Sequence, residues 1–316
     1  MSVKATLTLW RNRMTELEDF LAYLHTLDRS PHTLEAYQSD VKAFFNWLQM
    51  QLGREVLPTE VTPFDIQKYR DHLQAEGRKP GSINRRLAAL RAFFHWAVES
   101  GVVASNPANH VKVVRQVQHP PKALSKEAVY RLQRTAAARR QLAQARANGH
   151  VTPSLVNAIR DEAILNLLLY TGIRVSELVA LRLSDVQIGQ RSRKVIVHSG
   201  KGRKYREVPL HLQARKALQA YLDVRPQTED DHLFVGQRGP LHTRGVQMRV
   251  TALGEAAGVP VTPHVLRHTL ATRLLREGGA DLVTTAALLG HENVTTTAVY
   301  TQPGEQDLVA VVDKLE

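Results

Sequence analysis

The sequence of 316 residues has no cysteine, few aromatic residues (6%) and no long hydrophobic run. The lack of cysteine excludes disulfide bonds, thiolate catalysis and zinc sites built from cysteine. No segment approaches the roughly 18 consecutive apolar residues that a membrane helix needs, and no apolar segment follows the first residues as in a secretory signal. We therefore expect a cytoplasmic protein without a membrane partner, in which any nucleophile is an oxygen or a nitrogen.

Acidic residues are outnumbered in this chain. It has 42 Lys and Arg against 30 Asp and Glu, a net charge of +12 and a pI near 10.1. This excess predicts a polyanionic partner, either nucleic acid or an anionic membrane surface, although charge alone also allows a merely soluble basic protein. The hydrophobic content of 43% is enough to fill the cores of two ordinary domains.

The N-terminal third shows apolar residues at helical spacing and no strand-like alternation. Four segments carry the pattern, at residues 14–25, 33–48, 62–77 and 80–101. Pro31 fits the first turn of the second segment, and Gly77 and Gly101 stand where helices often end. Basic residues gather around the start of the last segment, namely Arg78, Lys79, Arg85, Arg86 and Arg91. They are either a solvated surface or, in a basic protein, a set of side chains that lie along DNA phosphates.

The helical pattern lapses in the stretch "VVRQVQHPPKA", which predicts a linker at residues 113–123. Residues 1–112 then form a helical domain, and residues 124–316 form a larger second domain. In the second domain, "KVIVH" and "REVPL" flank the turn "SGKGRK" and predict a β-hairpin. The expected fold class is mainly α with a small antiparallel β-sheet.

The stretch "PHVLRHTLATRL" places His264, Arg267 and His268 at i, i+3 and i+4 of a predicted helix. The three residues are compatible with a metal site, an acid/base pair, an anion-binding site or a polar helix surface. The zinc-protease pattern requires Glu directly after the first His, but Val265 stands there. Packing is therefore favoured over metal binding for His268.

Other candidate residues are ordinary when taken singly. Arg174 and Glu177 in "TGIRVSEL" have the spacing of a surface ion pair, and Lys201 lies between two glycines at the predicted hairpin tip. His291 follows a helix-ending glycine, and Tyr300 stands on a short amphipathic segment where a half-buried core residue is common. Their meaning depends on whether the fold brings them together.

Taken in order, these phrases resemble the tyrosine site-specific recombinases, the family of Xer recombinases, Cre and the lambda-type phage integrases. The matching stretches are "TGIRVSELVALRLSDV", "GKGRKYREVPL" and "HVLRHTLATRLL" followed by "GGADLVTTAALLGHENVTTTAVYT". "SPHTLEAYQSDVKAFFNWL" and "SINRRLAALRAFFHWAVESGVVASNPA" look like the helical, SAM-like core-binding domain of that family. The resemblance extends from about residue 14 to residue 306.

The resemblance implies a role for each matching residue. Tyr300 would be the nucleophile and would form a 3′-phosphotyrosyl bond. Arg174 and Arg267 would bind the non-bridging phosphate oxygens, a task that suits the planar guanidinium. Lys201 would be the general acid for the 5′-oxygen. Glu177 would support the first arginine, while His264 would assist proton transfer at the tyrosine and His291 would hydrogen-bond the phosphate. No metal and no cofactor are expected, since arginines supply the positive charge.

The resemblance also implies partners. The expected substrate is double-stranded DNA with specific recombination sites, held in a C-shaped clamp formed by the two domains. Arg203 and Lys204 of the hairpin turn are added to the DNA contacts. Strand exchange would use a tetramer of this chain on two DNA sites and a Holliday junction. A tail helix at about residues 305–316 would dock on a neighbouring protomer, or else fold back on its own domain, and accessory proteins are allowed.

One segment departs from the compact Xer pattern, an insertion around residues 139–157. It favours integration, excision or resolution of a mobile element at least as much as resolution of replicon dimers. Two other functions are compatible with the residues. One is a nicking-closing enzyme similar to type IB topoisomerases, and the other is a non-catalytic, sequence-specific DNA-binding protein.

Overall fold

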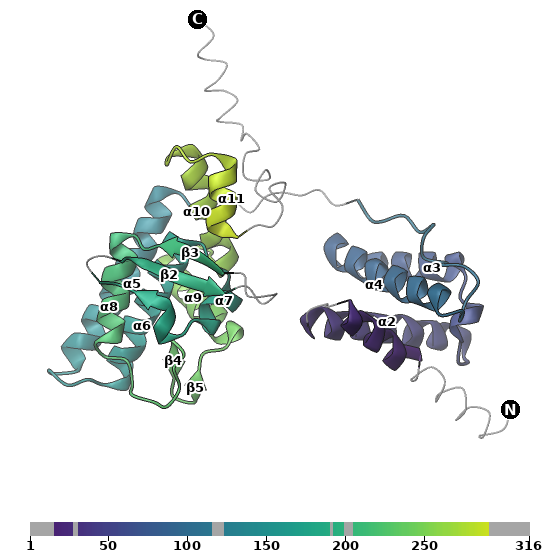
Figure 1. Cartoon of the computed structure of the whole chain (residues 1–316), viewed down its shortest axis with the longest axis horizontal. Coiled ribbons are helices and arrows are strands. Elements are labelled where there is room, and N and C mark those ends of the chain that lie inside the picture. Colours follow the sequence, from purple (N-terminus) through teal and green to yellow (C-terminus); the bar gives the residue numbers. More distant parts are fainter. Residues whose placement is uncertain (1–15, 28–30, 116–122, 190–191, 199–204, 291–316) are drawn as a thin grey trace, which may run out of the picture. The chain divides into compact units, whose positions relative to one another are not determined.

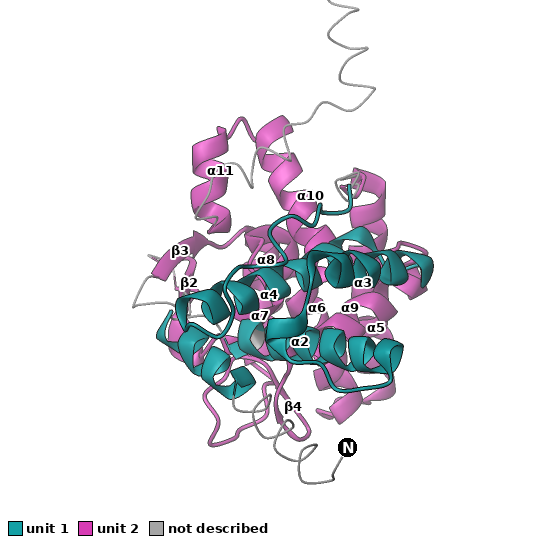
Figure 2. Cartoon of the chain, turned by 90° about the vertical axis from the view of Figure 1, so that its right-hand side faces the viewer, with its two compact units in different colours: residues 1–118 teal, residues 119–316 magenta. Residues whose placement is uncertain are grey.

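The structure, a computed structural model, describes residues 16–27, 31–115, 123–189, 192–198 and 205–290 (Figure 1). The chain divides into two compact units, Met1–Gln118 and His119–Glu316, coloured teal and magenta in Figure 2. The division falls within the predicted linker. Each unit has its own hydrophobic core.

All regular elements described in unit 1 are helical, as predicted. They are a helix over residues 16–26, α2 (Pro31–Leu52), the short 3-10 helix η1 (Pro58–Glu60), α3 (Pro63–Ala75) and α4 (Pro80–Glu99). Local signals set these ends: the Thr62 hydroxyl accepts from the Asp65 amide at the start of α3, and the Asp65 carboxylate accepts from the Thr62 amide in return. Aromatic rings fill the core, with Phe20 and Phe93 packed edge to face at a centroid distance of 5.4 Å.

The segment after α4 packs back onto unit 1. Ala108 and Val111 are buried in its core, and their carbonyl oxygens accept from Arg91 at 3.2 and 2.6 Å. Asn84 pairs with Val114 through both its amide nitrogen and its amide oxygen, at 2.9 and 2.8 Å. These contacts hold the chain to unit 1 as far as residue 114.

In unit 2 a small sheet lies against a group of helices (Figure 1). Its helices, in chain order, are α5 (Lys126–Arg146), α6 (Pro153–Thr171), α7 (Val175–Ala180), η2 (Leu183–Asp185), α8 (Leu212–Leu222), α9 (Thr243–Ala257), α10 (Pro263–Arg276) and α11 (Leu282–Leu289). Helix α6 is the central one: twelve of its residues are buried, most of them leucine, isoleucine, valine and alanine. None of the described helices is long and apolar enough to cross a membrane.

The sheet has the order β1-β2-β3, with β1 (Val186–Gln187), β2 (Lys194–His198) and β3 (Tyr205–Pro209) all antiparallel. Strands β2 and β3 pair from Lys194 opposite Pro209 to His198 opposite Tyr205. This confirms the predicted hairpin. The sequence did not indicate β1 or the separate pair β4 (Val235–Gly236) and β5 (Gly239–Pro240), because strands of two residues are too short to show alternation.

Candidate active site

Arg174 stands between two helices and is held on several sides. It is the N-cap of α7, where its backbone amide donates to Glu177 Oε2 at 2.7 Å. Its side chain donates to Glu177 Oε1 at 2.9 Å and to the Gly290 carbonyl oxygen at 3.0 Å. The side chain is 45% exposed. These two side-chain bonds use two of the five N–H donors of the guanidinium, so the exposed group can bind an anion as well.

Glu177 also binds a second arginine, Arg206 of β3. The two Nη atoms of Arg206 donate to the two carboxylate oxygens at 3.0 and 2.8 Å, the bidentate geometry that makes such pairs strong. Burial alone would raise the pKa of the Glu177 carboxyl. Hydrogen bonds from Arg206 and from the Arg174 amide, together with both positive charges, outweigh burial and hold that pKa below its ordinary value. Glu177 is therefore an ionised support between two arginines.

Arg267 is the buried arginine of the site, 5% exposed on α10. It donates to the Gly172 carbonyl oxygen at 2.6 Å and to the Leu289 carbonyl oxygen at 2.9 Å. These carbonyls lie at the C-terminal ends of α6 and α11. Arg267 therefore joins the ends of two helices.

Three guanidinium groups meet at the C-terminal end of α11. Arg206 donates to Leu288 at 3.1 Å, Arg267 donates to Leu289, and Arg174 donates to Gly290. Carbonyl oxygens at a helix C-terminus lack partners within the helix and carry partial negative charge, so cations are stabilising there. With Glu177 as the counter-charge, the cluster has a formal charge of +2 and favours an anionic ligand.

Two glycines allow this close approach. Gly172 ends α6 at φ 62°, and a Cβ there would lie 2.6 Å from Leu289 Cδ2 and 2.9 Å from Leu270 Cδ2. Gly290 ends α11 at φ 70°, and a Cβ there would lie 2.6 Å from Arg206 Nη1. Both positions thus combine a left-handed backbone with a lack of space for any side chain.

A pocket of about 670 Å³ opens beside the arginines. His264 of α10 lines it with Arg174 and Arg267, and Gln247 and Thr251 of α9 complete one side. His264 is exposed in the first turn of α10, where the Thr262 hydroxyl caps the helix by accepting from the Val265 amide. The structure thus brings together three predicted site residues, although Arg174 and Arg267 are 93 positions apart in the sequence.

His268 differs from His264 although it is on the same helix. It is buried at 5% exposure, and its pKa is lowered by desolvation and by the nearby His264 and Arg276. A neutral, buried imidazole fits packing between helices, the role that the sequence favoured for His268.

Five predicted residues lie outside the described residues: Lys201, Arg203, Lys204, His291 and Tyr300. Their neighbours are described. Tyr205 and Arg206 follow the hairpin turn in β3, and Gly290 directly precedes His291. Arg206 was not among the predicted site residues, although the sequence carried a signal for it: in the alternating strand "YREVP", Arg206 shares a face with the buried Val208. An arginine at an inward position requires a buried partner.

The basic residues of unit 1 have unequal surroundings. Arg78 and Lys79 are exposed at the start of α4. Arg85 is half exposed and pairs with the buried Asp40, while Arg86 donates to the Tyr69 hydroxyl at 2.9 Å. Arg91 Nε and Nη2 donate to the two carbonyl oxygens described above, so this side chain holds the segment after α4 to unit 1.

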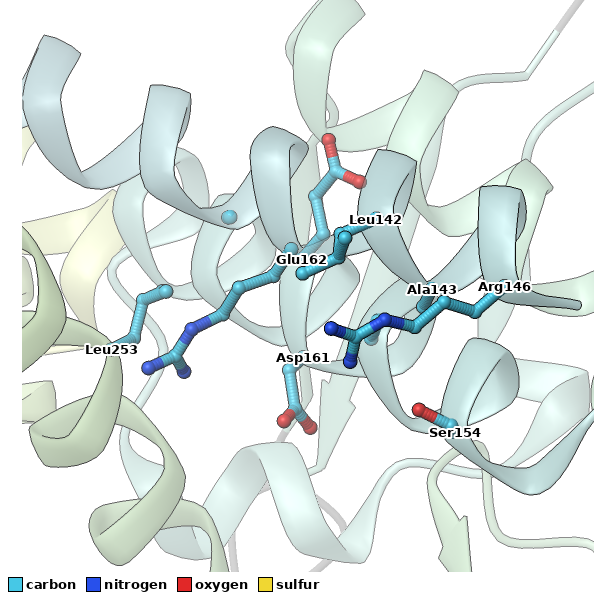
Figure 3. Close-up of a pocket in the computed structure, with 10 residues that line it drawn as sticks. Leu142, Ala143, Arg146, Ser154, Asp161, Glu162 and Leu253 are labelled. Carbon is cyan, nitrogen blue, oxygen red and sulfur yellow. The ribbon is translucent and has the colours of Figure 1, made fainter.

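Residues 139–157, the segment predicted to be an insertion, form the end of α5, the start of α6 and the turn between them. A second pocket of about 250 Å³ lies there, and Figure 3 shows Arg146, Ser154, Asp161 and Glu162 among its lining side chains. Arg139 donates to the Ala252 carbonyl oxygen at 3.1 Å, which joins α5 to α9. Among the candidate catalytic residues that the structure describes, none lines this pocket.

One group of three ligand-type side chains among the described residues lies close enough to hold an ion: Asp230, Asp231 and His232. These side chains already have partners. Asp230 Oδ1 accepts from the His232 amide at 2.8 Å, and Asp231 pairs with Arg182. The group includes no candidate catalytic residue, and we assign no metal to it.

Comparison with known proteins agrees with this arrangement. The model of the N-terminal SAM-like domain of phage integrases matches residues 17–101, and the model of the phage integrase family matches residues 140–307. The tyrosine recombinase XerC of Chlorobaculum parvum is 33% identical, over 94% of this chain and 93% of the relative. The tyrosine recombinase XerD of Listeria monocytogenes is 32% identical, over 90% of this chain and 93% of the relative.

A solved structure of the XerH site-specific recombinase bound to a palindromic difH substrate has the same fold. Its TM-score is 0.72 at 18% identity, over 89% of this chain and 79% of that chain. The family models cover both units, and the relatives span nearly the whole chain. The chain therefore belongs to the phage integrase family and is a tyrosine recombinase.

Proposed function

We propose that this recombinase cleaves and rejoins DNA at specific sites through a covalent bond between Tyr300 and a 3′-phosphate. The Tyr300 oxygen attacks the scissile phosphorus, the bond to the 5′-oxygen breaks, and Lys201 gives that oxygen a proton. Arg174 and Arg267 bind the non-bridging oxygens. His264 assists proton transfer at the tyrosine, and His291 hydrogen-bonds the phosphate. The 5′-hydroxyl of a second strand then reverses the reaction, which exchanges the strands.

The observation that carries this proposal is the placement of Arg174, Arg267 and His264 around one pocket. Phosphodiester cleavage develops negative charge on the equatorial oxygens, and fixed guanidinium groups stabilise it without reorganisation. Glu177 keeps Arg174 oriented, and Leu289 and Gly172 hold Arg267. The arrangement supplies charge from arginines, so the proposed reaction uses no metal ion and no cofactor.

The proposed partner is double-stranded DNA that carries recombination sites. Support comes from the net charge of +12 and from the similar solved structure of the XerH site-specific recombinase, which is bound to a palindromic difH substrate. We assign residues 1–112 to a core-binding domain, residues 113–123 to the linker and residues 124–316 to the catalytic domain. Arg78, Lys79 and Arg85 of unit 1 are exposed and suited to phosphate contacts. Arg86 and Arg91 are the less exposed members of that predicted set.

The proposed assembly is a tetramer of this chain on two DNA sites, with the tail at residues 305–316 docked on a neighbouring protomer and a Holliday junction between the two exchanges. Integration, excision or resolution of a mobile element or replicon dimer is the proposed biological role, with accessory proteins allowed. The proposed location is the cytoplasm, where such DNA lies.

The experiment uses a nicked substrate from which the short 5′-hydroxyl fragment diffuses away after cleavage, so that the covalent complex accumulates. Inverted repeats around a short spacer in the sequence flanking the gene would supply the candidate site. We expect an adduct that resists denaturing electrophoresis. Tyr300→Phe should abolish the adduct and leave DNA binding within about twofold of the wild-type protein, since the variant lacks only the nucleophile.

Two outcomes would contradict the proposal. A wild-type protein that binds the site but forms no adduct would be a DNA-binding protein without strand cleavage. Efficient relaxation of a supercoiled plasmid that lacks the site would instead indicate a nicking-closing enzyme similar to type IB topoisomerases.

A further inference from the structure

We propose that Arg206 is a positioning residue for strand cleavage. It fixes Glu177 and the end of α11 so that Arg174 and the chain entering His291 take up their working geometry. This inference rests on the proposed cleavage reaction, but it concerns a residue outside the proposed catalytic set.

Arg206 joins several elements of the site. Its Nη atoms bind both oxygens of Glu177, and its Nε donates to the Leu288 carbonyl oxygen. One side chain therefore connects strand β3, helix α7 and the C-terminal end of α11. Figure 1 shows α11 beside β3 at this place.

Arg206 is connected to Arg174 through acceptor groups that both side chains contact. Glu177 Oε1 accepts from Arg206 and from Arg174, at 3.0 and 2.9 Å. Gly290 and Leu288, which lie two residues apart, accept from Arg174 and Arg206 respectively. Arg174 thus has two anchors, the carboxylate and the helix end, and Arg206 holds both of them. Without Arg206, Glu177 loses its bidentate partner and Leu288 loses its side-chain donor, so each anchor loses part of its support.

Arg206 is less accessible to a ligand than Arg174. The Arg206 side chain is 16% exposed, whereas the Arg174 side chain is 45% exposed. Arg206 does not line the pocket that Arg174, His264 and Arg267 share. Its donors are directed at protein oxygens, and a Cβ at Gly290 would touch its guanidinium. Such a buried guanidinium orients other groups and does not itself bind the scissile phosphate.

Arg206 lies five positions after Lys201 in the sequence. Strand β3, which carries Arg206, is attached to the site through the bonds of Arg206 to Glu177. The same side chain holds the helix end that leads into His291. Arg206 therefore contacts the site from strand β3, which follows Lys201 in the chain, and also holds the end of α11, which precedes His291.

The test compares Arg206→Ala and Arg206→Lys with wild-type protein. It measures the single-turnover rate of adduct formation on the nicked substrate, the Kd for that substrate, and thermal unfolding. We expect adduct formation by Arg206→Ala to be about 100-fold slower, the size of effect that misplacement of a catalytic group by about 1 Å produces. Its Kd should stay within about threefold of wild type, because Arg206 makes no phosphate contact in this proposal.

Arg206→Lys keeps the charge and one bond to Glu177 but cannot form the two-pronged pair or reach Leu288 as well, so we expect a loss of about 10-fold. This variant keeps the proposal testable if Arg206→Ala fails to fold. The matched control is Glu207→Gln on the same strand. It removes the exposed pair between Glu207 and Lys194, 2.7 Å apart, and leaves the site untouched. The control should cleave within about twofold of wild type.

A double-variant measurement distinguishes positioning from general loss of stability. If Arg206 acts through Arg174, Arg206→Ala should slow cleavage less than about fivefold in an Arg174→Lys background, since residues that act as a unit are not additive. Three results would overturn the proposal. The losses in the double variant could be additive, the cleavage defect could follow the fraction of unfolded protein, or Arg206→Ala could cleave at the wild-type rate. Absence of an adduct with the wild-type protein would instead refute the cleavage reaction itself.

Discussion

Arg174 and Arg267 have the same proposed role toward phosphate, but the structure predicts different effects of their removal on stability. Arg267 is 5% exposed and supplies donors to the Gly172 and Leu289 carbonyl oxygens. Arg267→Ala leaves both oxygens without these donors, and each unsatisfied buried group costs about 1–3 kcal/mol. The expected loss in the free energy of unfolding is therefore about 2–6 kcal/mol, a large part of the stability of an ordinary domain.

Arg174→Ala should cost much less. Its side chain is 45% exposed, water can replace its bond to Gly290, and Glu177 keeps its bidentate pair with Arg206. We expect a loss below about 1 kcal/mol. Because 1 kcal/mol shifts Tm by about 2–4 °C in a domain of the size of unit 2, Arg267→Ala should lower Tm by about 8–16 °C for a mid-range loss of about 4 kcal/mol, and Arg174→Ala by less than about 4 °C.

The assay is thermal unfolding of both variants by circular dichroism, with Arg267→Lys as an intermediate. A lysine carries one ammonium group in place of the guanidinium fork, so it should recover about half of the lost stability. Equal Tm shifts for Arg174→Ala and Arg267→Ala would refute the assignment of a structural function to Arg267. If the prediction holds, cleavage by Arg267 variants must be measured well below their Tm before any loss is attributed to phosphate binding.

Two further predictions concern the supports of the site. Glu177→Gln should lower Tm by an amount that is constant above about pH 5.5 and shrinks as the pH falls below about 4.5. The reason is that the pKa of the Glu177 carboxyl is lower in the folded protein than in the unfolded chain. The stability that this carboxylate contributes is therefore present above the unfolded pKa and is lost as the pH falls through the folded pKa. Convergence of the two proteins near neutral pH in a titration of Tm would contradict the ionised pair. Gly172→Ala should cost about 2–5 kcal/mol, from its left-handed backbone together with the contacts of the new Cβ at Leu289 and Leu270. Gly258 has the same φ of 62°, but a Cβ added there has nothing within 4 Å, so Gly258→Ala should lose only the backbone contribution of about 1–2 kcal/mol. Equal losses for the two variants in urea unfolding would rule out the close approach at Gly172.

Helix ends were predictable from the sequence because their signals are local. Thr62 caps α3, Ser125 caps α5, and Gly172 and Gly290 end α6 and α11, each within a few residues of the feature that it sets. The β2–β3 hairpin was predictable for the same reason. Helix α6 likewise begins at Pro153, where the Thr152 hydroxyl caps it by accepting from the Leu155 amide.

Contacts between distant residues were not predictable from local patterns. Arg91 was predicted to contact phosphate because it stands among basic residues, and no local pattern indicated that the chain folds back at Ala108 and Val111 to bind its Nε and Nη2. Glu177 was expected to support Arg174 alone, whereas it also binds Arg206, 29 positions away. The spacing of i and i+3 on a helix is visible in a sequence, but the register that brings a strand to that helix depends on tertiary packing.

The meeting of three arginines at the end of α11 has a consequence for how the site forms. The arginines come from the start of α7, from β3 and from α10, so their convergence requires unit 2 to be folded. Three guanidinium groups repel one another, and they are held together by Glu177 and by the carbonyl oxygens of Leu288, Leu289 and Gly290. The remaining excess of positive charge is not neutralised within the cluster. A DNA phosphate that supplies this missing negative charge would therefore stabilise the same geometry that it needs for cleavage, which links substrate binding to the order of the site.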